Sequence, residues 1–260
     1  MARPTITNRF YTIYRDLVLL GPKDTFYRYA KRIQRHIHKP ISESIDQEFD
    51  RQFGVDTTQW SMPDDLRIRS TNQKSGCAYV PTPADLFRTM LRHVQADLRD
   101  YVFIDMGAGK GLALLMASQY QFKKIIGVEY SETLAAIAHS NISAHKRHTQ
   151  HRRDITCLCS DACDFKFPAQ PAVVYFYNPF QGKVMDKVIR NIEQSLEHQP
   201  RDLWIVYYTP WEDRKFRRSS RFRIVESTVS FSVYQSVFLR DRNARSVEGG
   251  HGHQKEKRKQ

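Results

Sequence analysis

The residues best suited to chemistry lie where a buried apolar run ends in an acid and enters a glycine-rich turn. Asp105 is followed at alternate positions by Gly107, Gly109 and Gly111. Glycine adopts positive φ without steric cost and carries no side chain, so a ligand can lie directly against this backbone. The next apolar run ends in Glu129, 22 residues after the first glycine, where a carboxylate suits the two hydroxyls of a ribose. The pattern therefore predicts a site for a nucleoside-bearing ligand.

The spacing of the glycines distinguishes between cofactors. The dinucleotide pattern G-x-G-x-x-G needs a glycine where the chain has Leu112, and a P-loop needs Ser or Thr where Gly111 follows Lys110. The carboxylate of Asp105 would also repel a pyrophosphate, whereas it attracts the ammonium and sulfonium groups of S-adenosylmethionine. We therefore expect S-adenosylmethionine as the cofactor. A NAD-dependent oxidoreductase is the alternative that Leu112 argues against.

The hydrophobic pattern predicts the elements that position these residues. Apolar runs are typical of strands, and amphipathic segments are typical of helices. The expected strands are 101–106, 125–130, 155–160, 173–178 and 203–209, and the expected helices between them are 111–120, 132–145 and 184–196. Such alternation predicts an α/β fold whose parallel sheet has helices on both faces. The last two runs, 222–229 and 232–239, are too close together for a parallel crossover, so we expect them to be antiparallel.

Two motifs resemble a known family. The pattern D-x-G-x-G-x-G from Asp105 to Gly111, followed by G-V-E ending at Glu129, resembles the cofactor signature of class I S-adenosylmethionine-dependent methyltransferases. The stretches FIDMGAGKG, IIGVEYS and YFYNPF are similar to those of small bacterial methyltransferase-domain proteins without an assigned substrate. The resemblance covers residues 77–240. It implies a Rossmann-like sheet of seven mostly parallel strands with an antiparallel last strand.

The resemblance also implies roles for individual residues. The glycine turn would hold the amino-acid end of the cofactor, Glu129 its ribose, and Asp161, with Ala162, the amino group of its adenine. The implied cofactor-binding residues are Asp105, Gly107, Gly109, Gly111, Glu129 and Asp161. Tyr79, which precedes the core, could close over the cofactor or simply pack against it.

The fourth expected strand ends in Asn178-Pro179-Phe180. Ligands of open parallel sheets bind beyond the carboxyl ends of the strands, so Asn178 should face the same crevice as Asp105. Its amide oxygen could accept a hydrogen bond from a nucleophilic amine, and Phe180 could stack on a planar substrate. The motif resembles the Asn-Pro-Pro-aromatic motif of amino-group methyltransferases, with one proline missing. The alternative is that Asn178 caps the next helix while Phe180 packs beneath it.

These residues predict methyl transfer to a nitrogen or oxygen nucleophile, with Asn178 and Phe180 as the catalytic pair. The acceptor, whether protein, nucleic acid or small molecule, stays open, and a non-catalytic S-adenosylmethionine-binding or RNA-binding protein is the alternative. A stretch from Arg214 to Arg223 has six basic residues in ten, with two phenylalanines. It could contact nucleic acid through phosphates and stacked bases, or it could be an ordinary solvated surface.

Length and composition set the remaining limits. The chain has 260 residues, a formal charge of +13 and 40% hydrophobic residues, enough for a sizeable core, and no apolar run is long enough to span a membrane. We expect a helical appendage and linker at 1–76, a methyltransferase domain at 77–240 and a disordered basic tail at 241–260. The four cysteines suggest neither a disulfide scaffold nor a metal site, and we expect Cys157, Cys159 and Cys163 to be buried. A reducing cytoplasm fits this usage better than an organelle, although an acid-free N-terminus weakly suggests a presequence.

Overall fold

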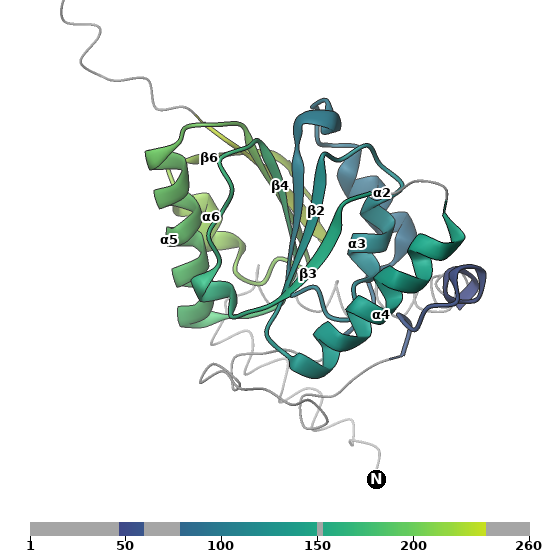
Figure 1. Cartoon of the computed structure of the whole chain (residues 1–260). Coiled ribbons are helices and arrows are strands. Elements are labelled where there is room, and N and C mark those ends of the chain that lie inside the picture. The colour runs from purple at the N-terminus through teal and green to yellow at the C-terminus, as the bar shows by residue number, and fades with distance from the viewer. Residues whose placement is uncertain (1–46, 60–78, 150–152, 238–260) are drawn as a thin grey trace, which may run out of the picture.

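The computed structural model describes residues 47–59, 79–149 and 153–237, and most of them belong to one sheet with helices on both of its faces (Figure 1). The sheet has seven strands in the order β3-β2-β1-β4-β5-β7-β6. Their bounds are β1 (Val102–Met106), β2 (Lys124–Glu129), β3 (Ile155–Cys159), β4 (Ala172–Tyr177), β5 (Leu203–Tyr208), β6 (Phe222–Ser227) and β7 (Phe231–Ser236). The predicted α/β class and the number of strands are confirmed.

Strand direction follows the predicted topology. Strands β1 to β5 pair in parallel, and β7 is antiparallel to both β5 and β6. The strand order reverses around β1, which lies between β2 and β4. Such a reversal leaves a crevice beyond the carboxyl ends of the strands, because the connecting helices leave in opposite directions. The fold therefore places a ligand-binding crevice at the ends of β1, β2 and β4.

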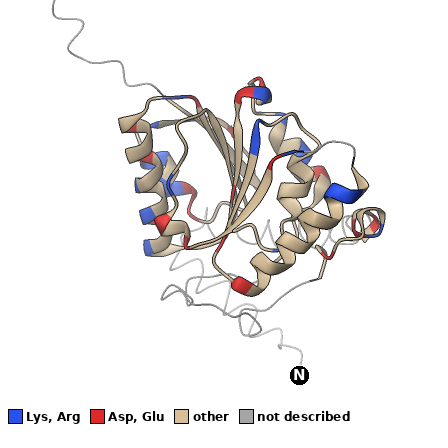
Figure 2. Ribbon diagram, viewed as in Figure 1, with Lys and Arg blue, Asp and Glu red and all other residues tan. Residues whose placement is uncertain are grey.

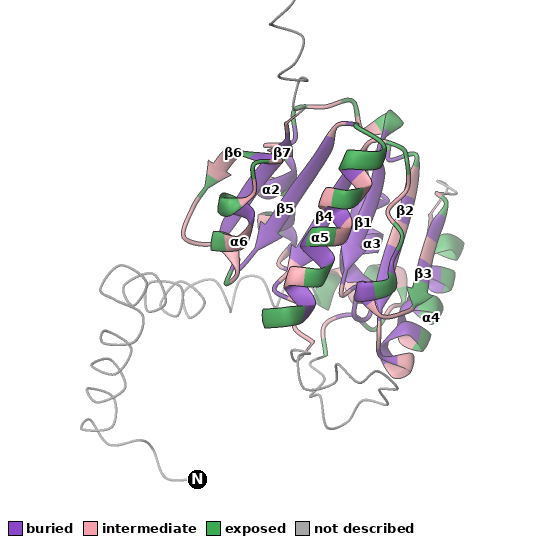
Figure 3. Cartoon of the chain, turned by 90° about the vertical axis from the view of Figure 1, so that its left-hand side faces the viewer, coloured by how far each residue is buried: buried purple, intermediate pink, exposed green. Residues whose placement is uncertain are grey.

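Two hydrophobic cores flank the sheet. Neighbouring residues of β1, such as Phe103 and Ile104, face opposite cores, as the two-residue period of a strand requires. One core is covered by α2 (Ala84–Leu91), α3 (Leu112–Ala117) and α4 (Glu132–His148), and the other by α5 (Gly182–His198) and the short α6 (Asp213–Arg218). Short 3-10 turns, η3 (Leu98–Asp100) and η4 (Ala162–Asp164), precede β1 and follow β3. Figure 3 shows the central strands β1, β4 and β5 buried between these layers, which explains why they are nearly continuous apolar runs.

The sequence also predicts a helix that starts at Pro83, with Thr82 as its N-cap. In the structure the N-cap residue of α2 is Pro83 and no side chain caps the helix, so the predicted cap is wrong. The buried hydroxyl of Thr82 instead forms a hydrogen bond of 2.9 Å with the hydroxyl of Tyr175 on β4. The Thr82 side chain therefore ties the segment before α2 to the sheet.

The burial of the cysteines differs in part from the prediction. Cys157 and Cys163 are buried, as predicted. Cys159 is exposed, because the end of the edge strand β3 faces solvent, so its predicted burial is wrong.

No helix in the described part of the chain could cross a membrane, and no group of metal-ligating side chains occurs there. Cys77 and the predicted tail at 241–260 lie outside the described residues, as does most of the predicted appendage.

Candidate active site

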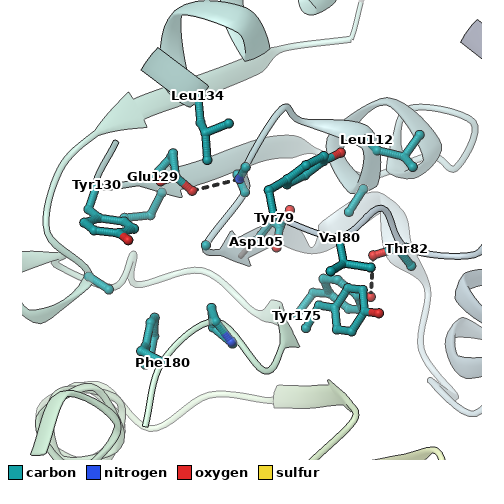
Figure 4. Close-up of a pocket in the computed structure, with 18 of the residues that line it drawn as sticks. Tyr79, Val80, Thr82, Asp105, Leu112, Glu129, Tyr130, Leu134, Tyr175 and Phe180 are labelled. Atoms are coloured by element: carbon teal, nitrogen blue, oxygen red, sulfur yellow. Dashed lines mark hydrogen bonds between the residues drawn. The ribbon is translucent and has the colours of Figure 1, made fainter. Parts of the chain in front are cut away.

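A pocket opens at the carboxyl ends of β1, β2 and β4, where the fold predicts a ligand site (Figure 4). It holds about 890 Å³ of space between atoms, the solvent in its open mouth included. Six of the residues singled out from the sequence line it: Asp105, Gly107, Gly109, Glu129, Asp161 and Phe180. Gly111 and Asn178 do not line it.

The glycines of the turn are required by what lies against them. Gly107 has φ +90° and Gly109 has φ +54°. A Cβ atom on Gly107 would come within 2.4 Å of Pro179, and one on Gly109 within 2.2 Å of the ring of Tyr79. Gly111, with φ +86°, instead forms the left-handed N-cap of α3 and packs on Ala138 of α4. The glycines therefore let Pro179 and the ring of Tyr79, both of which line the pocket, pack directly against the backbone of the turn.

Glu129 connects the end of β2 to the glycine turn. The backbone N–H of Gly109 donates to its Oε2 at 2.8 Å, and that of Ser131 donates to Oε1 at 2.9 Å (Figure 4). Burial raises the pKa of Glu129, and these backbone donors act against that rise. A carboxylate offers about four acceptor positions, so Glu129 can still accept a hydrogen bond from a ligand.

Asp105 is a buried carboxyl group at the end of β1, with no hydrogen bond or ion pair to any described residue. Burial, and then the charge of Glu129, raise its pKa to about 8. A cation entering the pocket would reverse this effect, because it favours the charged carboxylate. The position of Asp105 thus suits a positively charged ligand group.

Asn178 follows β4 in the left-handed conformation, with φ +40°, which asparagine tolerates better than most residues. Only 8% of the residue is exposed, and its Oδ1 has no hydrogen-bond donor among the described residues. The N-cap of α5 is Gln181, so Asn178 does not cap that helix. Phe180 lines the pocket and also packs on Phe176, with ring centroids 6.2 Å apart.

The neighbouring strand end carries a residue that sequence reasoning missed. Tyr177 and Tyr208 are paired in the sheet register, so Asn178 and Thr209 follow them side by side. Thr209 also has positive φ, at +50°, which is unusual for a β-branched residue. Trp211, which is 54% exposed, follows in the same loop. No sequence signal predicts the left-handed backbone of Thr209, because β-branched residues such as threonine rarely adopt positive φ.

The segment before α2 forms the remaining wall. Tyr79, Val80 and Thr82 line the pocket beside Tyr175 (Figure 4). The hydroxyl of Tyr79 donates a hydrogen bond of 2.7 Å to the carbonyl of Thr57. The tyrosine ring is therefore fixed at both ends, by Thr57 and by its contact with the glycine turn.

The sheet order, the glycine turn and the acid that ends β2 together define a Rossmann-like methyltransferase. The family model of the histone methylation protein DOT1 matches residues 60–153, which include β1, the glycine turn, β2 and α4. The sheet order and the matched segment are those of an S-adenosylmethionine-dependent methyltransferase, with S-adenosylmethionine as the cofactor. The glycine turn and the partnerless Asp105 fit that cofactor, which carries an ammonium group at its amino-acid end and a positive charge on its sulfonium sulfur.

Several solved structures resemble the chain at low identity. An RNA methyltransferase from Salinibacter ruber, in complex with S-adenosyl-L-homocysteine, is 17% identical, covers 60% of this chain and 92% of its own, and has a TM-score of 0.42. An rRNA methylase from Streptococcus thermophilus is 15% identical, with coverages of 60% and 97% and a TM-score of 0.39. TrmN from Thermus thermophilus is 16% identical, with coverages of 60% and 49% and a TM-score of 0.44. These similarities are too low to support an assignment. No curated protein matches the sequence.

Proposed function

We propose that the chain transfers the methyl group of S-adenosylmethionine to a nitrogen atom that carries hydrogen, and that Asn178 positions this nitrogen. The observation that supports this proposal is the buried Oδ1 of Asn178, which accepts no hydrogen bond from any described residue. Asn178 lies between the pocket residues Tyr177 and Pro179 but does not itself line the pocket, so an acceptor reaches this oxygen only when the Asn178 side chain turns toward the pocket. Leaving such an oxygen unpaired costs about 1–3 kcal/mol, so it favours a ligand that supplies an N–H group. An amine or amide nitrogen does so, and the hydrogen bond directs the nitrogen lone pair away from Asn178.

The cofactor half of the site has a matching set of roles. Asp105 would pair with the ammonium group, Glu129 would accept the ribose hydroxyls, and Asp161 would face the adenine; the contact expected for Gly111 stays a prediction. When bound, S-adenosylmethionine would supply an electrophilic methyl group on its sulfonium sulfur; S-adenosylhomocysteine would be the leaving group, and the proton of the methylated nitrogen would pass to water. Positioning contributes most of the acceleration of such a displacement, so the protein needs no strong base.

The acceptor molecule, whether protein, nucleic acid or small molecule, stays open under this proposal, and two observations bear on the first two classes. The matching family model carries the description of a histone methylation protein, which favours a side-chain amine. The basic stretch from Arg214 to Arg223 keeps nucleic acid as the second candidate. Much of its charge is already paired: Lys215 with Asp186 and Glu212, Arg217 with Asp213, and Arg221 with Glu197. In Figure 2, carboxylate residues lie among the basic residues of α5 and α6.

The proposal is tested in two stages. Calorimetric titration should show binding of S-adenosylhomocysteine and none of NAD. Transfer of a labelled methyl group to protein, RNA and DNA fractions then identifies the acceptor, and an RNA acceptor should bind less tightly as salt rises. Binding without transfer to any fraction would favour the non-catalytic alternative, and binding of NAD alone would refute the assignment of the site.

The role of Asn178 has its own control. We expect Asn178→Ala to lower kcat about a hundredfold, as for other groups that orient a reacting atom, with little change in the Kd of S-adenosylhomocysteine. Asn191→Ala removes the same side chain from α5, where it donates to the carbonyl of Cys163, and should leave kcat unchanged. Equal activity of the Asn178 variant and wild type would show that Asn178 does not orient the acceptor.

A further inference from the structure

Residues 47–59 form a strap on the outside of the glycine turn, although they lie far from it in the sequence. The side chain of Asn141, on α4, holds the strap in place. The N–H of Asp56 donates to Asn141 Oδ1 at 2.9 Å, and Asn141 Nδ2 donates to the carbonyls of Asp56 and Lys110 at 2.9 and 3.0 Å. One buried amide therefore fixes the backbone of the strap and that of the glycine turn together.

The strap also supplies the counterion of a buried lysine. Lys110 lies between two glycines of the turn, and only 3% of its side chain is exposed. Its Nζ is 3.0 and 3.1 Å from the two carboxylate oxygens of Asp56, whose side chain is 50% exposed. Removing a carboxylate that pairs with a buried charge is costly, because the remaining charge cannot reach water. Lys110 therefore needs Asp56 as its counterion, whereas the half-exposed carboxylate of Asp56 can also be solvated by water.

The third contact reaches the pocket wall. The carbonyl of Thr57, a fully buried residue next to Asp56, accepts the hydrogen bond from Tyr79. The ring of Tyr79 lies against Gly109 and 5.8 Å from the Nζ of Lys110. Asp50 holds Thr57 in turn, since its carboxylate accepts from the backbone N–H and the hydroxyl of Thr57. The strap thus determines both the charge behind the turn and the aromatic wall in front of it.

This arrangement has an electrostatic consequence for the cofactor, and the reasoning rests on the proposed function. An unpaired Lys110 would place a positive charge directly behind the pocket, and the sulfonium of S-adenosylmethionine is also positive. We propose that Asp56 is a positioning residue that cancels the charge of Lys110, so that the pocket accepts the cationic cofactor. S-adenosylhomocysteine lacks the methyl group and the sulfonium charge, so its binding depends less on Asp56.

The experiment compares the Kd values of the two ligands in the full chain. In Asp56→Asn, we expect the affinity for S-adenosylmethionine to fall about tenfold and that for S-adenosylhomocysteine about threefold or less. Lys110→Met removes the positive charge that Asp56 compensates. The ratio of the Kd for S-adenosylmethionine to the Kd for S-adenosylhomocysteine should therefore fall slightly. In the double variant, Asp56→Asn should add no further penalty against S-adenosylmethionine.

The control is Asp154→Asn, which removes a carboxylate from the exposed pair that Asp154 forms with Lys124 at 3.6 Å and should not change the ratio. A merely structural role of Asp56 would lower the melting temperature and weaken both ligands equally. An unchanged ratio in both Asp56→Asn and Lys110→Met overturns the inference. If Asp56→Asn does not fold, the ratio of the two Kd values in Lys110→Met still tests the inference. Failure of the wild type to bind either ligand would instead refute the proposed function.

Discussion

The two sides of the pocket are built differently. On the side of β1 and β2, Glu129 accepts two backbone N–H groups and Lys110 has its counterion, so the polar groups around the turn are mostly satisfied. On the side of β4 and β5, the buried Oδ1 of Asn178 has no donor in the described part of the chain. Under the proposed roles, the backbone of the cofactor side (the ends of β1 and β2) is held in advance, and each side keeps one buried polar group for its ligand: Asp105 on the cofactor side and Asn178 on the acceptor side (the ends of β4 and β5).

Backbone conformation separates the two sides in the same way. Positive φ on the cofactor side belongs to glycines, which adopt it freely. On the acceptor side it belongs to Asn178 and Thr209 as well as to Gly182, and for the two residues that are not glycine it costs energy. Such strain persists where neighbouring structure enforces it, here including the hydrogen bond of 2.7 Å from the N–H of Thr209 to the carbonyl of Ser230. The acceptor side thus stores strain that the cofactor side avoids.

The largest effect on stability should come from Gly107, because this glycine of the turn packs against Pro179, which follows β4. Gly107→Ala combines unfavourable φ with a contact of 2.4 Å to Pro179, so we expect it to lower the free energy of unfolding by about 2–4 kcal/mol. Gly182→Ala is the control, since φ there is +59° and a Cβ atom would meet nothing within 4 Å; it should cost about 1 kcal/mol. Urea unfolding measures both. Equal costs would show that Pro179 simply moves aside.

The next effect concerns Glu129. Glu129→Gln removes the charge and presents an amide N–H₂ to a backbone donor, Gly109 or Ser131. We expect S-adenosylhomocysteine to bind about tenfold or more weakly, because hydrogen bonds to a charged group contribute about 1.5–3 kcal/mol. Glu132→Gln removes the same charge three residues later, outside the pocket lining, and serves as the control in the calorimetry. Similar Kd values for both variants would contradict the assigned role.

A smaller effect depends on pH and on Asp105. Its folded-state pKa, about 8, lies above that of an unfolded aspartate. The protonated carboxyl is therefore favoured by folding, so the stabilisation is full below about pH 4 and is lost as pH rises through about 8. Melting temperatures should fall from pH 6 to pH 8, and Asp105→Asn should remove part of that fall. The same slope in both proteins would rule Asp105 out as its source.

Ligand binding gives a second readout of the same group. If Asp105 receives the ammonium group of S-adenosylhomocysteine, binding at pH 7 releases part of a proton, because the ammonium favours the carboxylate. Calorimetry in two buffers with different ionisation enthalpies measures this release. It should be smaller in Asp105→Asn, and its persistence there would assign the proton to another group.

The smallest effect should come from Thr209. Thr209→Gly relieves about 1–2 kcal/mol of left-handed strain and loses some of it to the greater chain entropy of glycine. We expect a gain of about 0.5 kcal/mol in the free energy of unfolding. Thr156→Gly, in the extended backbone of β3, should be destabilising and provides the contrast. A loss at Thr209 as large as that at Thr156 would show that the left-handed backbone stores no strain.

Much of the sheet was predictable from the sequence. The buried strands β1, β4 and β5 are continuous apolar runs, because both of their faces are covered. Once the strands are placed, Asp105, Glu129 and Asn178 must gather at one edge, since parallel strands end together. The close spacing of the last two runs likewise required an antiparallel pair, as β6 and β7 form.

The details that were not predictable depend on residues far apart in the chain. Thr82 appeared to be a cap because its bond to Tyr175, 93 residues away, leaves no local sign. Lys110 could be read only as a failed P-loop residue, since its counterion Asp56 is 54 residues earlier. Local patterns report local structure, whereas these contacts arise from tertiary packing.

The strand order also constrains how the molecule is assembled. The last described strand, β7 (Phe231–Ser236), lies between β5 and β6 rather than at the edge of the sheet. During synthesis, β5 therefore has an unpaired edge until β7 leaves the ribosome, and such an edge can pair with other chains. A nascent chain that stalls before Phe231 would be prone to aggregation even though every strand of its pocket has been made.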